Sequence, residues 1–180
     1  FQLIQYAPTT KKVHATPLVI FPPWINKFYI LDLKEQNSLV KWITDQGFTL
    51  FVVSWKNPDA SYADVTLDTY VEEGFLTAID EVKKICGVPK VNTVGYCIAG
   101  TTLALTLSLL KQRGDTSIKS ATFFTALTDF SDQGEVGVFL DAYAQGLCPI
   151  VNSFRCRLSE DKAFFAILTD ETFAHLTSDD

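Results

Sequence analysis

The chain has 180 residues and a mass of 20.1 kDa, which suits one domain with its own core rather than two. Hydrophobic residues make up 47% and charged residues 20% of the sequence, so the composition excludes a disordered or collagen-like chain. The formal net charge is −6 and no basic cluster occurs, which disfavours nucleic acid as a partner. No run of 18 apolar residues and no pattern of a secretion signal is present, so we expect a soluble chain without a transmembrane segment.

The four cysteines, Cys86, Cys97, Cys148 and Cys156, form no CxxC pair, and only two histidines could complete a zinc site. We therefore expect no metal and no cofactor. An adequate core without an export signal favours free thiols in a reducing compartment, which predicts a cytoplasmic protein. The absence of Met and the start within an alternating apolar pattern indicate an internal fragment of a longer sequence.

Strands and helices alternate along the first 130 residues. The sequence predicts an edge or hairpin strand at 1–6, a buried strand at 17–21, a helix from Asn37 or Ser38 to Gly47, a strand at 48–55, a helix from Thr66 to Gly87, a strand at 91–96, a helix at 97–112 and a strand at 119–129. This order predicts an α/β fold with a mostly parallel sheet and helices on both faces. Ligands of such folds bind beyond the carboxyl ends of the strands.

Two of the predicted helices differ in their apolar surface. The helix after Thr66 has one apolar face, made of Leu67, Tyr70, Val71, Gly74, Phe75, Ala78, Ile79, Val82 and Ile85. The helix at 97–112 is apolar nearly all round, which is typical of a helix buried against a sheet. After Phe130 the pattern loosens, and the remaining residues give no clear succession of elements.

The segment 95–100, GYCIAG, lies between a predicted strand and a predicted helix, where α/β-hydrolases carry their nucleophile on a sharp turn. Such a turn strains the backbone of the nucleophile and requires small residues two positions before and two after it. Gly95 and Ala99 meet this requirement, although the usual pattern has Gly in both places. The pattern therefore predicts that Cys97 is a catalytic nucleophile.

At this position the amino end of the following helix favours a thiolate, which can attack an acyl thioester. The backbone N–H of Ile98 would be one oxyanion donor, and Trp24 or Ile25, in the loop after the strand at 17–21, would supply the second. The alternative is that Cys97 is a small buried hydrophobe, as most free cysteines are. The glycine-flanked turn favours the nucleophile, whereas we interpret Cys86, Cys148 and Cys156 as structural or incidental.

A nucleophilic cysteine needs a base, which this fold supplies later in the chain. His14 precedes the nucleophile and is expected to be a solvated surface residue. His175 has the right order but no preceding strand to position it, so we do not expect it to be the base. Asp129 could be an acid or a turn former, and the turn is favoured.

Four blocks of residues resemble polyhydroxyalkanoate synthases, the family that makes bacterial storage polyester such as poly-3-hydroxybutyrate. The blocks are PPWINKFYILDL at 22–33, SW at 54–55 with NPD at 57–59, GYC at 95–97, and ATFF at 121–124 with TDF at 128–130. They occur in the family's order and spacing and cover about residues 1–140. The first block is much more specific than the GYC motif alone.

The resemblance implies an incomplete α/β-hydrolase core at 1–130 and, at 131–180, the start of an inserted cap followed by an atypical tail. It implies that Cys97 attacks (R)-3-hydroxyacyl-CoA, in the manner of the short-chain type that uses 3-hydroxybutyryl-CoA, releases CoA and carries the growing polyester chain as a thioester. It also implies a homodimer, a granule surface as partner and a granule-associated cytoplasmic location. The family's activating His and assisting Asp lie near the C-terminus of the full-length enzyme and have no counterpart here.

After about Asp141 the sequence departs from the family. A truncated gene product, a shifted reading frame or a partial sequence would each explain this departure. We therefore expect the 180-residue chain alone to have little or no polymerase activity. Two other functions stay open: a cysteine hydrolase or thioesterase of the same fold, and a non-catalytic remnant that binds a partner protein or the granule surface through exposed apolar strands.

Overall fold

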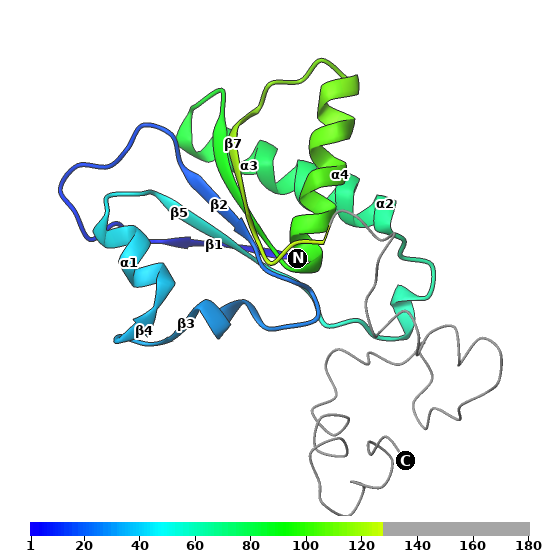
Figure 1. Ribbon diagram of the computed structural model, residues 1–180, viewed down its shortest axis with the longest axis horizontal. Coiled ribbons are helices and arrows are strands. Elements are labelled where there is room, and N and C mark those ends of the chain that lie inside the picture. The colour runs from blue at the N-terminus through cyan, green and yellow to red at the C-terminus, as the bar shows by residue number, and fades with distance from the viewer. Residues whose placement is uncertain (128–180) are drawn as a thin grey trace, which may run out of the picture. The chain divides into compact units, whose positions relative to one another are not determined.

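The computed structural model describes residues 1–127 (Figure 1). Its elements, in chain order, are β1 (Gln2–Tyr6), β2 (Leu18–Phe21), the 3-10 helix η1 (Phe28–Leu31), β3 (Asp32–Lys34), β4 (Asn37–Ser38), α1 (Leu39–Asp45), β5 (Leu50–Ser54), the 3-10 helix η2 (Ala60–Tyr62), α2 (Leu67–Thr69), the π-helical segment η3 (Tyr70–Leu76), α3 (Thr77–Cys86), β6 (Val91–Tyr96), α4 (Ile98–Gln112) and β7 (Ile118–Phe124).

Five strands form one mixed sheet in the order β1-β5-β2-β6-β7. Strand β2 is parallel to both β5 and β6, and β7 is parallel to β6, whereas β1 runs antiparallel to β5. The predicted, mostly parallel sheet is therefore confirmed. Residues 1–6 were predicted to form either an edge strand or a hairpin strand, and β1 is an edge strand. In register, Phe21 pairs with Gly95 and Tyr96 with Phe124, so the carboxyl ends of three strands meet at one edge.

Helices cover both faces of the sheet, as predicted. On one face, α1 contributes Val40 and Ile43 to a core cluster with residues of β2, β5 and β6. On the other face, α3 and α4 pack on the same strands, with Ile79 and Leu103 fully or almost fully buried. Because the central strands are apolar on both sides, the sheet is sandwiched between two hydrophobic layers.

The helix boundaries follow the expected capping residues. Ser38 caps α1, since its hydroxyl accepts a hydrogen bond from the Lys41 N–H at 2.7 Å. Gly47 and Gly87 end the first two predicted helices with φ values of 81° and 63°, in the left-handed region that glycine adopts readily.

The helix predicted between Thr66 and Gly87 is not uniform, which corrects the prediction. It comprises α2, the π-helical segment η3 and α3. The wider π turn changes the register of side chains along the helix. The predicted apolar face is buried in its middle, but its two outer members, Leu67 and Ile85, are 43% and 56% exposed.

Three further predictions need correction. The strand predicted at 119–129 ends at Phe124, because Thr125 has a φ of 46° and turns the chain. One side of α4 is open within residues 1–127, where Leu105 is 45% exposed, because the sheet covers this helix on the other side only. A small hairpin, β3 with β4, lies where no strand was predicted.

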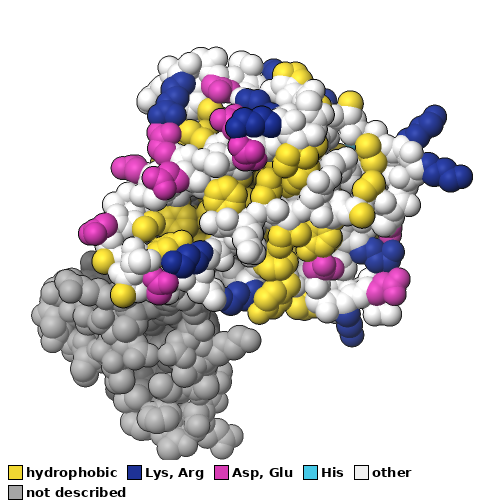
Figure 2. All heavy atoms as spheres, turned by 180° about the vertical axis from the view of Figure 1, so that it is seen from behind, with side chains coloured by type: hydrophobic (Ala, Val, Ile, Leu, Met, Phe, Trp, Pro, Cys, Tyr) yellow, Lys and Arg dark blue, Asp and Glu magenta, His cyan; other side chains and the backbone are white. Residues whose placement is uncertain are grey.

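Apolar side chains also reach the surface of the described residues, and Figure 2 shows such patches among charged groups on one face. On β7, Phe123 and Phe124 are 42% and 37% exposed. None of the helices in residues 1–127 is both long and apolar enough to cross a membrane.

Candidate active site

Cys97 lies at the sharp turn between β6 and α4 that the sequence predicts. Its backbone has φ 55° and ψ −127°, and its side chain is exposed rather than buried in the core. The Cys97 carbonyl accepts hydrogen bonds from the N–H groups of Gly100 and Thr101, at 2.8 and 3.2 Å. The alternative interpretation of Cys97 as a buried hydrophobe is therefore wrong, while its catalytic role stays a prediction.

The turn is tight because β6 and α4 approach each other through two glycines. A Cβ placed on Gly95 would lie 2.7 Å from the Gly100 Cα and 3.0 Å from the Ala99 carbonyl oxygen. The requirement for a small residue at Gly95 is thus confirmed. The residue facing it is Gly100, one position later than predicted, which explains why Ala99 fits here although its methyl is fully buried.

The segment after β7 supports this turn from outside. The Cys97 N–H donates to the Phe124 carbonyl at 2.8 Å, and the Thr101 hydroxyl donates to the Leu127 carbonyl at 2.6 Å. Ala126 lies so close to α4 that a Cβ on Gly100 would come within 2.5 Å of the Ala126 Cβ. Ala126 and Leu127 were not predicted to take part in the site, and only this packing reveals them.

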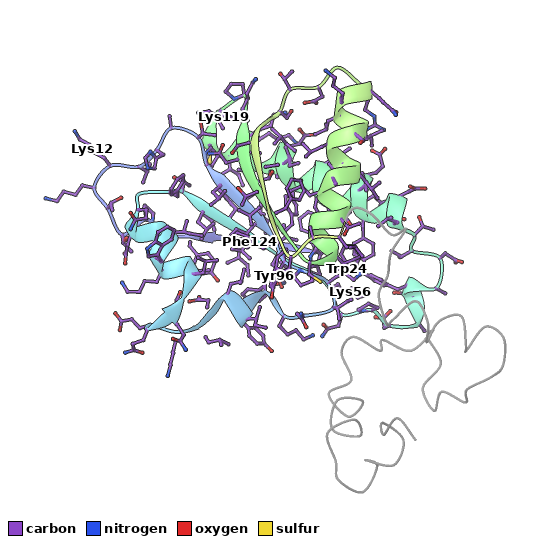
Figure 3. The ribbon with its side chains drawn as sticks, viewed as in Figure 1. Lys12, Trp24, Lys56, Tyr96, Lys119 and Phe124 are labelled. Atoms are coloured by element: carbon purple, nitrogen blue, oxygen red, sulfur yellow. The ribbon has the colours of Figure 1, made fainter. Side chains whose placement is uncertain are left out.

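The proposed oxyanion donors lie at the same edge of the sheet as Cys97. Ile98 begins α4, and its N–H donates to no backbone carbonyl within residues 1–127, as expected for the first turn of a helix. Trp24 and Ile25 are half-buried in the loop that follows β2. Since β2 and β6 are parallel neighbours, this loop and the Cys97 turn leave the sheet at the same edge, and Trp24 and Tyr96 project there in Figure 3.

The loop after β2 is held by the residues that follow β5. The Trp55 indole Nε1–H donates to the Pro22 carbonyl at 2.7 Å. The Trp24 ring stacks on Tyr70 of η3, with centroids 4.2 Å apart, and meets Trp55 edge-on at 6.0 Å. Sequence reasoning missed Trp55 and Tyr70 as parts of the site; Gly74, a glycine inside a helical pattern, was the available signal of a close approach.

Two other titratable residues within residues 1–127, His14 and Cys86, were expected to have no catalytic role, and both lie away from Cys97. His14 is exposed, contacts Phe48 and the Gln46 carbonyl, and precedes β2, so it lies at the opposite end of the sheet from Cys97. It is a surface residue, as predicted. Burial raises the pKa of the Cys86 thiol, whose side chain packs against the core, in agreement with a structural role. His175, Asp129, Cys148 and Cys156 lie outside the described residues.

Comparison with known proteins identifies the family. The family model described as the N-terminus of poly-beta-hydroxybutyrate polymerase (PhaC) matches residues 1–43. The chain is 48% identical over 141 residues to the poly(3-hydroxyalkanoate) polymerase subunit PhaC of Cupriavidus necator and 51% identical over 140 residues to the poly(3-hydroxyalkanoate) polymerase of Methylorubrum extorquens. The matched part of this chain belongs to the poly(3-hydroxyalkanoate) polymerase family.

The two matches cover 78% of this chain but only 24% and 23% of the relatives, so the chain spans about a quarter of the length of the curated polymerases it matches. More distant members are also similar, among them polymerase 2 of Ectopseudomonas oleovorans, at 36% identity over 141 residues and 25% of its length. The polymerase resemblance expected from the four blocks is thereby confirmed.

Solved structures support the predicted fold class. A lipase-esterase related protein from Clostridium acetobutylicum has a TM-score of 0.55 at 12% identity, covering 82% of this chain and 55% of that one. A marine microorganism esterase has a TM-score of 0.52 at 13% identity, covering 97% of this chain and 60% of that one. At such identities the likeness shows the fold alone: this chain has an α/β-hydrolase core with a mostly parallel sheet and flanking helices.

Proposed function

We propose that this chain is the nucleophile-bearing part of a polyhydroxyalkanoate synthase that polymerises (R)-3-hydroxybutyryl-CoA into storage polyester. The observation that carries the proposal is the exposed Cys97 at a positive φ between β6 and α4, in a chain that is 48% identical over 141 residues to a named polymerase. A non-glycine residue keeps such a backbone conformation only where its surroundings impose it, and such positions cluster at active sites.

In the proposed reaction, the Cys97 Sγ attacks the thioester carbonyl of the monomer. The C–S bond to CoA breaks, CoA leaves as its thiol, and the acyl group stays on Cys97 as a new thioester. The hydroxyl of a further hydroxyacyl group then attacks this thioester: an ester C–O bond forms, the C–S bond to Cys97 breaks, and the hydroxyl proton passes to the regenerated Cys97 thiol, so the chain is longer by one unit. The Ile98 N–H, with the N–H of Trp24 or Ile25, stabilises the oxyanion that forms at each attack.

The remaining machinery belongs to parts of the enzyme beyond the described residues. In this proposal residues 131–180 include the start of the cap, and a His and an Asp nearer the C-terminus of the full-length enzyme activate the thiol and the hydroxyl. The complete enzyme is a homodimer in the cytoplasm, associated with the granule surface. We expect the 180-residue chain alone to have little or no polymerase activity.

A hybrid polymerase tests the proposal. Residues 1–127 replace the matching segment of the Cupriavidus necator polymerase, and CoA release from 3-hydroxybutyryl-CoA is followed together with polyester formation. We expect both in the hybrid and neither in its Cys97→Ala variant, while Cys86→Ala, the matched control, retains activity. Activity that survives Cys97→Ala would contradict the proposal.

The products separate the two alternatives. Free 3-hydroxy acid without polyester would favour a thioesterase, in which water accepts the acyl group. Granule binding that is unaffected by Cys97→Ser in a hybrid without any CoA release would favour a non-catalytic remnant. The isolated 180-residue chain should release CoA no faster than its own Cys97→Ala variant.

A further inference from the structure

Trp55, the residue that follows β5, is hydrogen-bonded to the loop after β2. Its indole N–H donates to the carbonyl of Pro22, a buried residue that immediately follows β2 in the sequence. Buried carbonyls require a hydrogen-bond partner, and losing one leaves the oxygen desolvated without compensation. Pro22 is two residues before Trp24, so this hydrogen bond fixes the start of the loop that carries Trp24 and Ile25, the two candidates for the second oxyanion donor.

The indole is itself held in place on two sides. It stacks on the fully buried Phe75, with centroids 5.7 Å apart and an interplanar angle of 29°. On the helix side, it lies against Gly74 of η3, where an added Cβ would come within 3.0 and 3.1 Å of its ring atoms Cζ3 and Cη2. A side chain at position 74 would therefore displace the ring by a few tenths of an ångström, so Gly74 lets the ring lie where it does.

Further contacts join the loop after β2 to the residues that follow β5 and to η3. The Trp24 ring meets Trp55 edge-on and stacks on Tyr70. The Lys27 ammonium donates to the Asn57 side-chain carbonyl, which ties the far end of the loop to the residues after β5. The loop is thus fixed at its beginning, at Trp24 and at Lys27, while the backbone N–H groups of Trp24 and Ile25 lie between these points.

We propose that Trp55 is a positioning residue that sets the second oxyanion donor opposite Cys97, with Gly74 providing the space for its ring. The inference rests on the proposed function and deepens it, because it assigns to Trp55 an effect on acyl transfer alone. Oxyanion donors must lie within a narrow distance of the developing charge, and a displacement of about 1 Å can cost about 100-fold in rate. The thiol, held by a separate turn, keeps its own position when Trp55 is changed.

The test compares two reactions of the same thiol in the full 180-residue chain. p-Nitrophenyl butyrate acylates Cys97: the Sγ–C bond forms, the bond to p-nitrophenolate breaks, and this anion leaves without being protonated. Iodoacetamide alkylates the same sulfur by displacement of iodide, and no oxyanion forms. Both reactions are run at alkaline pH, where thiols ionise without a neighbouring base, and mass spectrometry locates the modification.

Trp55→Phe keeps an aromatic ring but removes the indole N–H. We expect it to slow acylation at Cys97 by about tenfold or more while changing alkylation by less than about twofold. Gly74→Ala, which leaves the N–H present but displaces the ring, should slow acylation to a smaller extent, again without affecting alkylation. Trp42→Phe is the matched control, because Trp42 is 60% exposed on α1, and it should change neither rate.

The outcomes separate this inference from the function on which it rests. Equal slowing of both reactions, or an unchanged acylation rate in Trp55→Phe, would overturn the positioning role while leaving Cys97 as the nucleophile. Acylation of Cys97→Ala at the wild-type rate would overturn the proposed function, and this inference with it. Circular dichroism of each variant confirms that a lower rate does not reflect unfolding, and Gly74→Ala remains as a second test should Trp55→Phe fail to fold.

Discussion

The two parts of the candidate site are built in opposite ways. The Cys97 turn is made of neighbours in sequence, since Gly95 and Gly100 are five positions apart and touch across the turn. The loop after β2 is held by residues far along the chain, because Pro22 and Trp24 depend on Trp55 and Tyr70. One part is encoded by the absence of side chains, and the other by the packing of large rings.

This difference teaches where each part is sensitive to mutation. In the turn, the backbones approach so closely that even a methyl group does not fit. In the aromatic cluster, defined as Phe21, Trp24, Trp55, Tyr70 and Phe75, the loop position depends on ring volume and on a hydrogen bond. Additions should therefore damage the first part and deletions the second.

Among these variants, Phe75→Ala should have the largest effect on stability. Phe75 is fully buried and stacks on Phe21, with centroids 4.1 Å apart, so its loss creates a cavity in the core beneath Trp55. We expect the free energy of unfolding to fall by about 3–5 kcal/mol. Urea denaturation followed by circular dichroism measures the change.

The matched control is Phe124→Ala. Phe124 lies at the end of β7 and is 37% exposed, so the same truncation there should cost clearly less. An equal loss in the two variants would show that the aromatic cluster has no special part in the stability of this domain.

Gly100→Ala tests the turn by addition. The new Cβ would lie 2.5 Å from the Ala126 Cβ and 3.0 Å from the Gly95 carbonyl oxygen, so the segment after β7 must move away from α4. We expect a loss of about 1–3 kcal/mol in the free energy of unfolding. Adding Ala126→Gly should recover part of this loss, and a double-mutant cycle measures the coupling. Strictly additive effects of the two substitutions would contradict the close contact.

Much of the fold could be predicted from sequence because the elements follow local rules. Apolar runs between turn residues mark β2, β5 and β6, and Ser38, Gly47 and Gly87 mark helix ends through their capping preferences. The GYCIAG segment predicts the turn for the same reason, since the small residues that it needs lie within a few positions of Cys97.

The rest of the site could not be predicted because it depends on contacts between distant residues. Nothing near Trp55 in the sequence shows that its indole bonds to Pro22, and nothing near Thr125 shows that β7 ends beside Cys97. The π-helical segment was missed because its apolar residues also satisfy ordinary helical spacing. Gly74 was the one local sign, and it was interpreted as part of a continuous apolar face.

The backbone strain at Cys97 should have a smaller effect on stability. At φ 55° a Cβ is unfavourable, so Cys97→Gly should be more stable than Cys97→Ala by about 1 kcal/mol, after allowing for the greater freedom of glycine in the unfolded chain. Both variants lack the thiol, so the comparison isolates the backbone. Ala99→Gly, in the first turn of α4, should instead lower stability. Equal unfolding midpoints for the two Cys97 variants would mean that the turn stores no strain.

The smallest expected effect concerns the ion pair between η3 and the residue that follows α4. Glu72 in η3 accepts hydrogen bonds from the Arg113 guanidinium at the end of α4, one of them 3.0 Å long. These bonds hold the pKa of the Glu72 carboxyl below its ordinary value of 4.5. A carboxyl whose pKa is lower in the folded than in the unfolded protein adds stability above the ordinary pKa and loses it as the pH falls through the folded value.

Wild type should therefore unfold at a slightly higher urea concentration than Glu72→Gln at pH 7, and the gap should close as the pH falls below the ordinary pKa of glutamate. Salt should reduce the gap, because both side chains are about half exposed. Glu73→Gln, at an exposed neighbour outside this pair, should leave the midpoint nearly unchanged. A gap that persists at low pH would show that Glu72 acts through packing. In that case α4 and η3 would be joined by contacts other than this charge pair.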